Sequence, residues 1–148
     1  MNDVTPLKLL VPVDGSANSL RAVDYAIAWI RDRRTPAELH LLNVRRNITY
    51  GEVKKFASAE AVSDFYRQEG LRALEEARKR LDQADIQYGY HVRVATHVAE
   101  GIADYAGEHG FDHIVMGSRG LGTIAGLLLG SKATKVLYLV DMPVTLVK

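Results

Sequence analysis

Residues 7–16 have the sequence LKLLVPVDGS, a short apolar run that ends in an Asp-Gly-Ser turn. Such a run, rich in Leu and Val and closed by turn and helix-capping residues, predicts a buried strand from Leu7 to Val13 with a helix after it. From Ser19 onward, apolar residues at three- and four-residue steps form one helical stripe until the Arg-Arg-Thr-Pro run at 33–36. The chain is therefore predicted to open with a strand, a turn and a helix.

The same order of strand and helix repeats along the rest of the chain. Strands are predicted at 38–44, 88–95, 111–116 and 144–147, and helices at 59–81, around 102–106 and around 133–140. Arg45 to Ala57 is predicted to be a loop, and Gly70 is a candidate kink in the long helix. Because strands alternate with helices, the sequence predicts an α/β fold, in which parallel strands form one sheet with helices on both faces.

The composition is that of one ordinary globular domain spanning residues 1–148. Hydrophobic residues make up 47% of the chain and charged residues 25%, so a core can form without metal or disulfide staples. The absence of cysteine excludes disulfides, thiolate metal sites and a cysteine nucleophile. Nineteen basic and eighteen acidic residues give a net charge of +1, too little for the broad cationic surface of a nucleic-acid binder.

Membrane and export signals are not evident either. No apolar run reaches the ~18 to 20 residues that span a bilayer, and the start of the chain, MNDVTPLK, does not have the pattern of an export signal. We therefore expect a cytoplasmic protein that binds neither nucleic acid nor membranes.

The segment from Gly117 to Gly130 holds five of the twelve glycines. Since glycine has no Cβ, backbone N–H groups in such a segment can approach a bulky anion, and phosphate suits this best. Gly130-Ser131 then opens a helix, whose free N–H groups and positive dipole end add a second anion site. The residues alone leave open whether the segment binds phosphate or is only a tight connection.

In an open parallel sheet, ligands bind beyond the carboxyl ends of the strands, where the winding direction reverses. If the first and fourth strands are neighbours, the Asp14 turn faces the glycine segment across that crevice. Asp14 then contacts a ligand or is simply a turn residue, and Ser131 contacts phosphate or caps its helix. Arg119 and Lys132 supply positive charge to the ligand or are solvated surface charges.

Several catalytic and binding motifs are absent or misplaced. Residues 120–125 match the dinucleotide pattern G-x-G-x-x-A, but only one short strand follows, so the βαβ unit that this pattern needs is missing. There is no P-loop and no G-x-S-x-G elbow. The histidines are scattered without metal-ligand spacing and are expected at the surface or at strand ends: His40, His91, His97, His109 and His113.

With these residues in place, the chain resembles the universal stress protein family over essentially its full length, and within it the ATP-binding branch. The motif of that branch is G-x2-G-x9-G-[ST], which Gly117, Gly120, Gly130 and Ser131 match at every position. LLVPVDGSANS matches the family's first strand and turn, and HIVMGSRG matches its fourth strand. The resemblance implies a five-stranded parallel sheet in the order 3-2-1-4-5.

The resemblance also implies contacts with ATP, accompanied by Mg²⁺ or Mn²⁺. Asp14, with Pro12 and Val13, is expected at the adenine or ribose, and Val44 against the base. The other expected contacts border the nucleoside or hold the phosphates: Met116, Gly117, Gly120, Gly130, Ser131, Lys132 and Ala133. At position 132 family members often carry a small apolar residue, so the lysine is a departure.

Family members tend to dimerise through the last strand, which here is an apolar edge. We therefore expect a homodimer formed by Val144, Thr145, Leu146 and Val147. The resemblance further implies a nucleotide-dependent regulatory or signalling module in stress response. No candidate base has a convincing partner to activate water, so any ATP hydrolysis is expected to be slow. The alternatives are a slow ATP hydrolase or phosphotransferase, and a nucleotide-independent dimeric adaptor.

Overall fold

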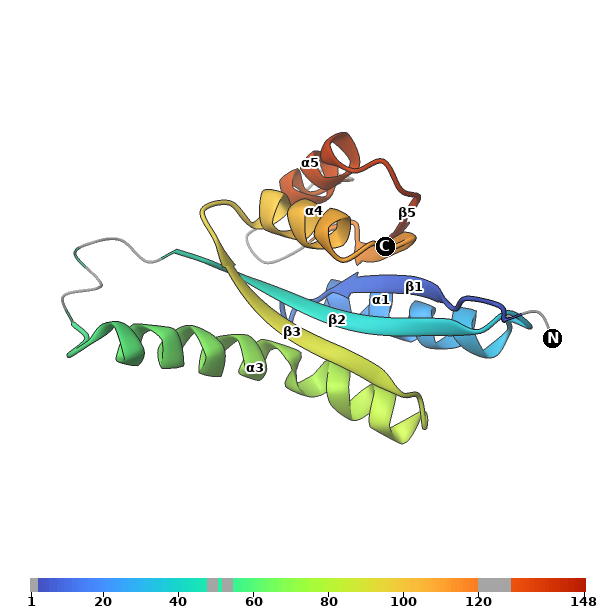
Figure 1. The fold of residues 1–148 in the computed structure, drawn as a ribbon, viewed down its shortest axis with the longest axis horizontal. Coiled ribbons are helices and arrows are strands. Elements are labelled where there is room, and N and C mark those ends of the chain that lie inside the picture. The colour runs from blue at the N-terminus through green and yellow to red at the C-terminus, as the bar shows by residue number, and fades with distance from the viewer. Residues whose placement is uncertain (1–2, 48–50, 52–54, 120–128) are drawn as a thin grey trace.

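Five parallel strands form one sheet in the order β3-β2-β1-β4-β5, with helices on both faces (Figure 1). The computed structural model describes residues 3–47, 51, 55–119 and 129–148. Along the chain the elements are β1 (Leu7–Pro12), α1 (Ala17–Arg31), β2 (Ala37–Arg46), α3 (Ala59–Gln83), β3 (Tyr88–Ala95), α4 (Val98–Glu108), β4 (His113–Gly117), α5 (Ser131–Leu139) and β5 (Val144–Val147). The predicted fold class and strand order are confirmed.

Side chains alternate between the two faces of the sheet, so the core has two layers. On one face, Leu9 and Val11 of β1 pack with buried residues of α1 and α3. On the other face, Leu10 packs with α4 and α5, and Figure 1 shows the two helix pairs on opposite sides of the sheet. Because both faces are covered, a central strand such as β1 is almost continuously apolar. Within the described ranges, no helix is long and apolar enough to cross a membrane.

Several element boundaries differ from the prediction by a residue or two, and backbone pairing explains the end of β2 and the start of β4. The prediction of a loop is wrong for Arg45 and Arg46, which continue β2 and pair with the end of β3. Phe111 precedes β4 instead of starting it, since its N–H donates at 3.0 Å to a carbonyl in the last turn of α4. Within the predicted loop, residues 48–50 and 52–54 lie outside the described ranges.

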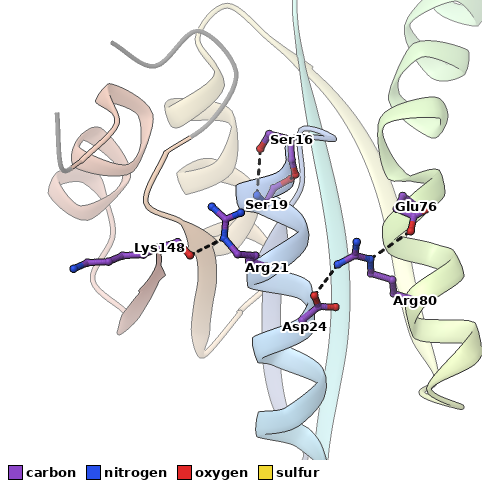
Figure 2. A network of polar contacts seen from close by, with 7 residues as sticks. All are labelled: Ser16, Ser19, Arg21, Asp24, Glu76, Arg80 and Lys148. Atoms are coloured by element: carbon purple, nitrogen blue, oxygen red, sulfur yellow. Dashed lines mark hydrogen bonds and ion pairs between the residues drawn. The ribbon is translucent and has the colours of Figure 1, made fainter. Parts of the chain in front are cut away.

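α3 is attached to both β3 and α1. It runs as a helix past Gly70, where a Cβ would lie 2.4 Å from Cγ1 of Val92, so glycine lets the helix pack directly onto β3. One side chain of α3 then bridges two helices: Arg80 donates to Asp24 of α1 at 2.7 Å and to Glu76 at 3.4 Å (Figure 2). These contacts hold the long helix against one face of the sheet.

Two histidines lie in the middle of strands. His40 of β2 and His91 of β3 stack on each other, with 2.9 Å between His40 Nδ1 and His91 Nε2. The His91 ring also contacts Tyr105 of α4. Burial lowers the pKa of His91, and the neighbouring His40 lowers it further. The expected surface or strand-end location is therefore wrong for this pair, while His113 does lie at a strand end.

Candidate functional site

The carboxyl ends of β1 and β4 lie side by side where the winding of the sheet reverses. β1 pairs with β4 in a register that places Leu9 opposite His113 and Leu10 opposite Ile114. β2 and β3 extend the sheet beyond β1, and β5 extends it beyond β4. The turn after β1 and the segment after β4 therefore leave the same edge of the sheet next to each other. The adjacency on which the predicted crevice depends is confirmed.

Internal hydrogen bonds hold the turn after β1. Asp14 Oδ1 accepts from the Ser16 N–H at 2.9 Å, and Gly15 has a φ of +85°, which favours glycine. Ser16 caps α1 by accepting from the Ser19 N–H at 3.2 Å, and Figure 2 shows both serines at the start of that helix. Asp14 thus stabilises the turn, and its half-buried carboxyl group lies at the carboxyl end of β1, where its contact with a ligand stays a prediction.

A buried asparagine fixes the end of β1. The Val13 N–H donates to the Leu42 carbonyl at 2.8 Å, and Asn43 Nδ2 donates to the Val13 carbonyl at 2.8 Å. Asn43 is 2% exposed, and its Oδ1 has no hydrogen-bond partner among the described residues. Proline has no N–H, and the N–H of Val13 already donates to Leu42. Pro12 and Val13 can therefore contact a ligand only through their side chains or carbonyls.

Val44 and Met116 lie on the α4 and α5 side of the sheet and are mostly core. Their exposed fractions are 8% and 6%, and they pack in the same cluster as Ala133 of α5. Gly101 of α4 makes room for Val44, because a Cβ there would lie 2.7 Å from Val44 Cγ1. The structure brings these three predicted site residues together, with little side-chain surface left to contact a base.

Backbone hydrogen bonds anchor the segment after β4. The Ser118 N–H donates to the Val147 carbonyl at 2.8 Å, and the Gly130 N–H donates to the Ser118 carbonyl at 2.6 Å. The Arg119 N–H donates to Asn18 Oδ1 at 2.6 Å. The N–H groups of Ser118, Arg119 and Gly130, which the glycine pattern suggested as anion donors, therefore form hydrogen bonds within the protein.

The first turn of α5 carries backbone donors at the same edge of the sheet. Gly130 caps this helix, so the alternative in which Ser131 is the cap is wrong, and Ser131 is instead the first helical residue. The first helical bond runs from the Thr134 N–H to the Gly130 carbonyl at 3.0 Å. Within the described part of the chain, the N–H groups of Ser131, Lys132 and Ala133 therefore have no partner.

Two exposed cations belong to the same region. Lys132 lies on the first turn of α5, and Arg119 follows β4. Lys135, one turn further along α5, instead pairs with Glu100 of α4 at 3.0 Å, and this contact lowers the pKa of Glu100. Gly120, the remaining predicted phosphate contact, lies outside the described residues. Across the described ranges, His, Asp and Glu side chains nowhere gather in a group of three that could hold a metal ion.

The sequence reasoning missed two buried asparagines, Asn18 and Asn43. The sequence carries a sign of each, because a polar residue stands at a position where the helix or strand pattern predicts an apolar one. Asn18 precedes the buried Ala22 and Ala26 at four-residue steps on the inner face of α1. Asn43 interrupts the apolar run of β2. An amide in such a position is expected to hydrogen-bond to nearby backbone, as both of these do.

Comparison with known proteins places the chain among relatives of similar length. The model of the Universal stress protein family matches residues 7–148. The chain is 30% identical to universal stress protein YxiE of Bacillus subtilis, over 95% of this chain and 98% of that protein. It is similar in structure to the protein MJ0577, with a TM-score of 0.79, 26% identity and coverage of 96% and 95%. It is also similar to a universal stress protein solved in complex with cAMP, with a TM-score of 0.70, 26% identity and coverage of 96% and 97%.

Proposed function

The chain belongs to the universal stress protein family, and from this premise we propose that it binds an adenine nucleotide, ATP with Mg²⁺ or Mn²⁺, at the carboxyl ends of β1 and β4. The bound nucleotide biases the conformation of the protein or its choice of partner, as expected of a regulatory module in stress response. The similarity to a universal stress protein in complex with cAMP supports an adenine nucleotide as the ligand class.

The observation that carries the proposal is the first turn of α5. Its first three N–H groups, on Ser131, Lys132 and Ala133, have no partner among the described residues; they lie at the positive end of the helix and suit a phosphate group. The exposed Lys132 adds a full positive charge on the same turn. Because the Gly130 N–H is bound to the Ser118 carbonyl, this turn is held in place before a ligand arrives, which lowers the entropic cost of binding.

In this proposal the nucleoside lies toward β1 and β2. Asp14, whose carboxyl group accepts a hydrogen bond from the Ser16 N–H, contacts the ribose or the adenine next to Pro12. Val44 and Met116 form an apolar floor with little exposed surface, so they limit the depth of the crevice. When bound, the divalent cation offsets the charge of the phosphate groups.

Calorimetric titration with ATP and with adenosine tests the proposal. Lys132→Ala is expected to weaken ATP binding by roughly fivefold, the loss of about 1 kcal/mol for one partly solvated charge near a phosphate. Adenosine, which has no phosphate, is expected to bind equally well to this variant and to the wild type. Lys135→Ala is the matched control, because it removes the same charge from the same helix at a position that pairs with Glu100.

Each result has a defined consequence. Equal losses of ATP affinity in Lys132→Ala and Lys135→Ala would indicate a general charge effect and contradict the phosphate site at α5. Saturating Mg-ATP that leaves the melting temperature unchanged would favour the nucleotide-independent adaptor, since a ligand that binds only the native state must stabilise it. Turnover of ATP that survives purification would favour the hydrolase.

The proposal extends to a homodimer that pairs through β5. This strand lies at an edge of the sheet beside β4, and Val144 to Val147 are half-buried. Just before it, the end of α5 exposes three large side chains, Leu137, Tyr138 and Leu139. An apolar strand edge next to exposed apolar side chains is typical of an interface. Sedimentation at micromolar concentration is expected to give twice the 16.4 kDa of the chain, and a monomer alone would contradict this pairing.

A further inference from the structure

We infer that Asn18 is a positioning residue that couples nucleotide binding to the C-terminal strand. Its amide joins the segment after β4 to the last residue of β5. The inference rests on the proposed function, because it concerns how the phosphate site is held and what its occupation does elsewhere in the protein. Asn18 occupies none of the positions of the glycine motif, so the motif does not assign it this role.

Asn18 uses both ends of its amide. It lies in the first turn of α1 and is 7% exposed. Its Nδ2 donates to the Val147 carbonyl at 2.9 Å, and its Oδ1 accepts from the Arg119 N–H at 2.6 Å. An asparagine side chain suits this position because it offers a donor and an acceptor at once. Removing it takes the hydrogen-bond acceptor from the Arg119 N–H and one of two donors from the Val147 carbonyl, both in a partly buried place.

Gly117 leaves the space that Asn18 fills. A Cβ on Gly117 would lie 2.4 Å from Oδ1 and 2.9 Å from Cγ of Asn18. Gly117 is not one of the described glycines with positive φ, so its backbone conformation does not require glycine. Glycine is required at this position because any Cβ would collide with the Asn18 amide. One residue of the glycine motif therefore serves to admit the asparagine amide.

The same hydrogen-bond network reaches α5. The Val147 carbonyl also accepts from the Ser118 N–H at 2.8 Å, and the Ser118 carbonyl accepts from the Gly130 N–H at 2.6 Å. Since Gly130 caps α5, two hydrogen bonds connect the end of β5 to the turn that carries the free N–H groups. A nucleotide bound to that turn stabilises the connected arrangement, and by linkage an intact β5 end strengthens nucleotide binding.

A matched control is available on the same helix. Arg21 Nε donates to the Lys148 carbonyl at 2.8 Å, so it also joins α1 to the end of the chain, but at the exposed surface (Figure 2). Arg21→Ala therefore removes one contact between α1 and the C-terminus while leaving the Asn18 network in place. Asn18→Ala removes both partly buried hydrogen bonds of the amide, and Asn18→Ser is a second, smaller perturbation.

The test measures ATP affinity by calorimetry and amide hydrogen exchange of residues 144–148 with and without ATP. In the wild type and in Arg21→Ala, ATP is expected to bind with equal affinity within about twofold and to slow exchange at the end of β5. The Asn18 variants are expected to bind ATP about tenfold more weakly, a typical effect of breaking a coupling network, and to lose the ATP-dependent slowing. A merely structural Asn18 would lower the melting temperature without changing the affinity of the folded protein.

The outcomes separate the inference from the proposed function. Wild-type affinity in Asn18→Ala, with wild-type slowing of exchange, would overturn the inference and leave the nucleotide site standing. A wild-type protein that binds no ATP would overturn the proposed function itself. If neither Asn18 variant folds, the wild-type exchange measurement decides alone, because bound ATP that leaves residues 144–148 unprotected would refute the coupling.

Discussion

Gly117→Ala is expected to be strongly destabilising although it adds only one methyl group. The new Cβ would lie 2.4 Å from Asn18 Oδ1 and 3.1 Å from the Arg119 carbonyl oxygen, and Asn18 is held by two hydrogen bonds. Overpacking of this kind costs about 1–3 kcal/mol, and displacing the amide forfeits about 1 kcal/mol for each bond lost. We therefore expect a loss of about 3 kcal/mol, which lowers the melting temperature by about 6–12 °C in a chain of this size.

Urea unfolding measures this loss, with the midpoint expected to fall at unchanged m-value. Gly107→Ala is the control, because a Cβ at this exposed position of α4 meets nothing within 4 Å. That substitution is expected to be neutral or to stabilise by up to about 1 kcal/mol through helix propensity. Both variants add one methyl group, and they differ in what surrounds it. The difference between their free energies of unfolding therefore measures the effect of the contact with Asn18.

A double-mutant cycle then isolates that contact. In an Asn18→Ala background the obstructing amide is gone, so Gly117→Ala is expected to cost less than about 1 kcal/mol, which gives a coupling energy of about 2 kcal/mol. A Gly117→Ala protein within about 0.5 kcal/mol of the wild type, or equal costs of Gly117→Ala in both backgrounds, would refute the reasoning.

Three further predictions concern the rest of the molecule. Burial and a neighbouring histidine lower the pKa of His91 in the folded protein, so on acidification the unfolded chain binds a proton at this residue before the folded chain does. The contribution of His91 to the free energy of unfolding is therefore fully present above about pH 6.5 and is lost below it, which urea midpoints measured against pH will show. Gly70→Ala is expected to lower the free energy of unfolding by about 1–3 kcal/mol because its Cβ would meet Val92. Arg80→Ala, which breaks an exposed pair with Asp24, is expected to cost only about 0.2–1 kcal/mol in the same assay.

Much of the fold could be predicted because hydrophobic period and turn chemistry are local properties. In the central strand LKLLVP the last four residues are buried, and the apolar stripe of α1 packs against this strand, as the spacing indicates. Element boundaries were harder to predict, since they depend on partners distant in sequence. Arg45 and Arg46 are polar, yet they remain in β2 because β3 is long enough to pair with them.

The candidate site was predicted in outline and less well in its contacts. The glycine pattern located the region, and the adjacency of β1 and β4 confirmed that its two sides meet. The pattern did not distinguish glycines by role. Gly117 makes room for Asn18, and Gly130 caps α5, so each has a role within the fold in addition to any contact with a ligand. The role of Gly117 depends on the side chain of Asn18, about a hundred positions away in the sequence, which a local pattern cannot show.

Analysis of the nucleotide released when the purified protein is denatured is the most direct test of the adenine-nucleotide site. Chromatography and mass spectrometry of the released material are expected to identify an adenine nucleotide, and protein stripped of it is expected to bind ATP again. Neither adenine nucleotide in the released material nor ATP binding at millimolar concentration or below would contradict a nucleotide site at the carboxyl ends of β1 and β4.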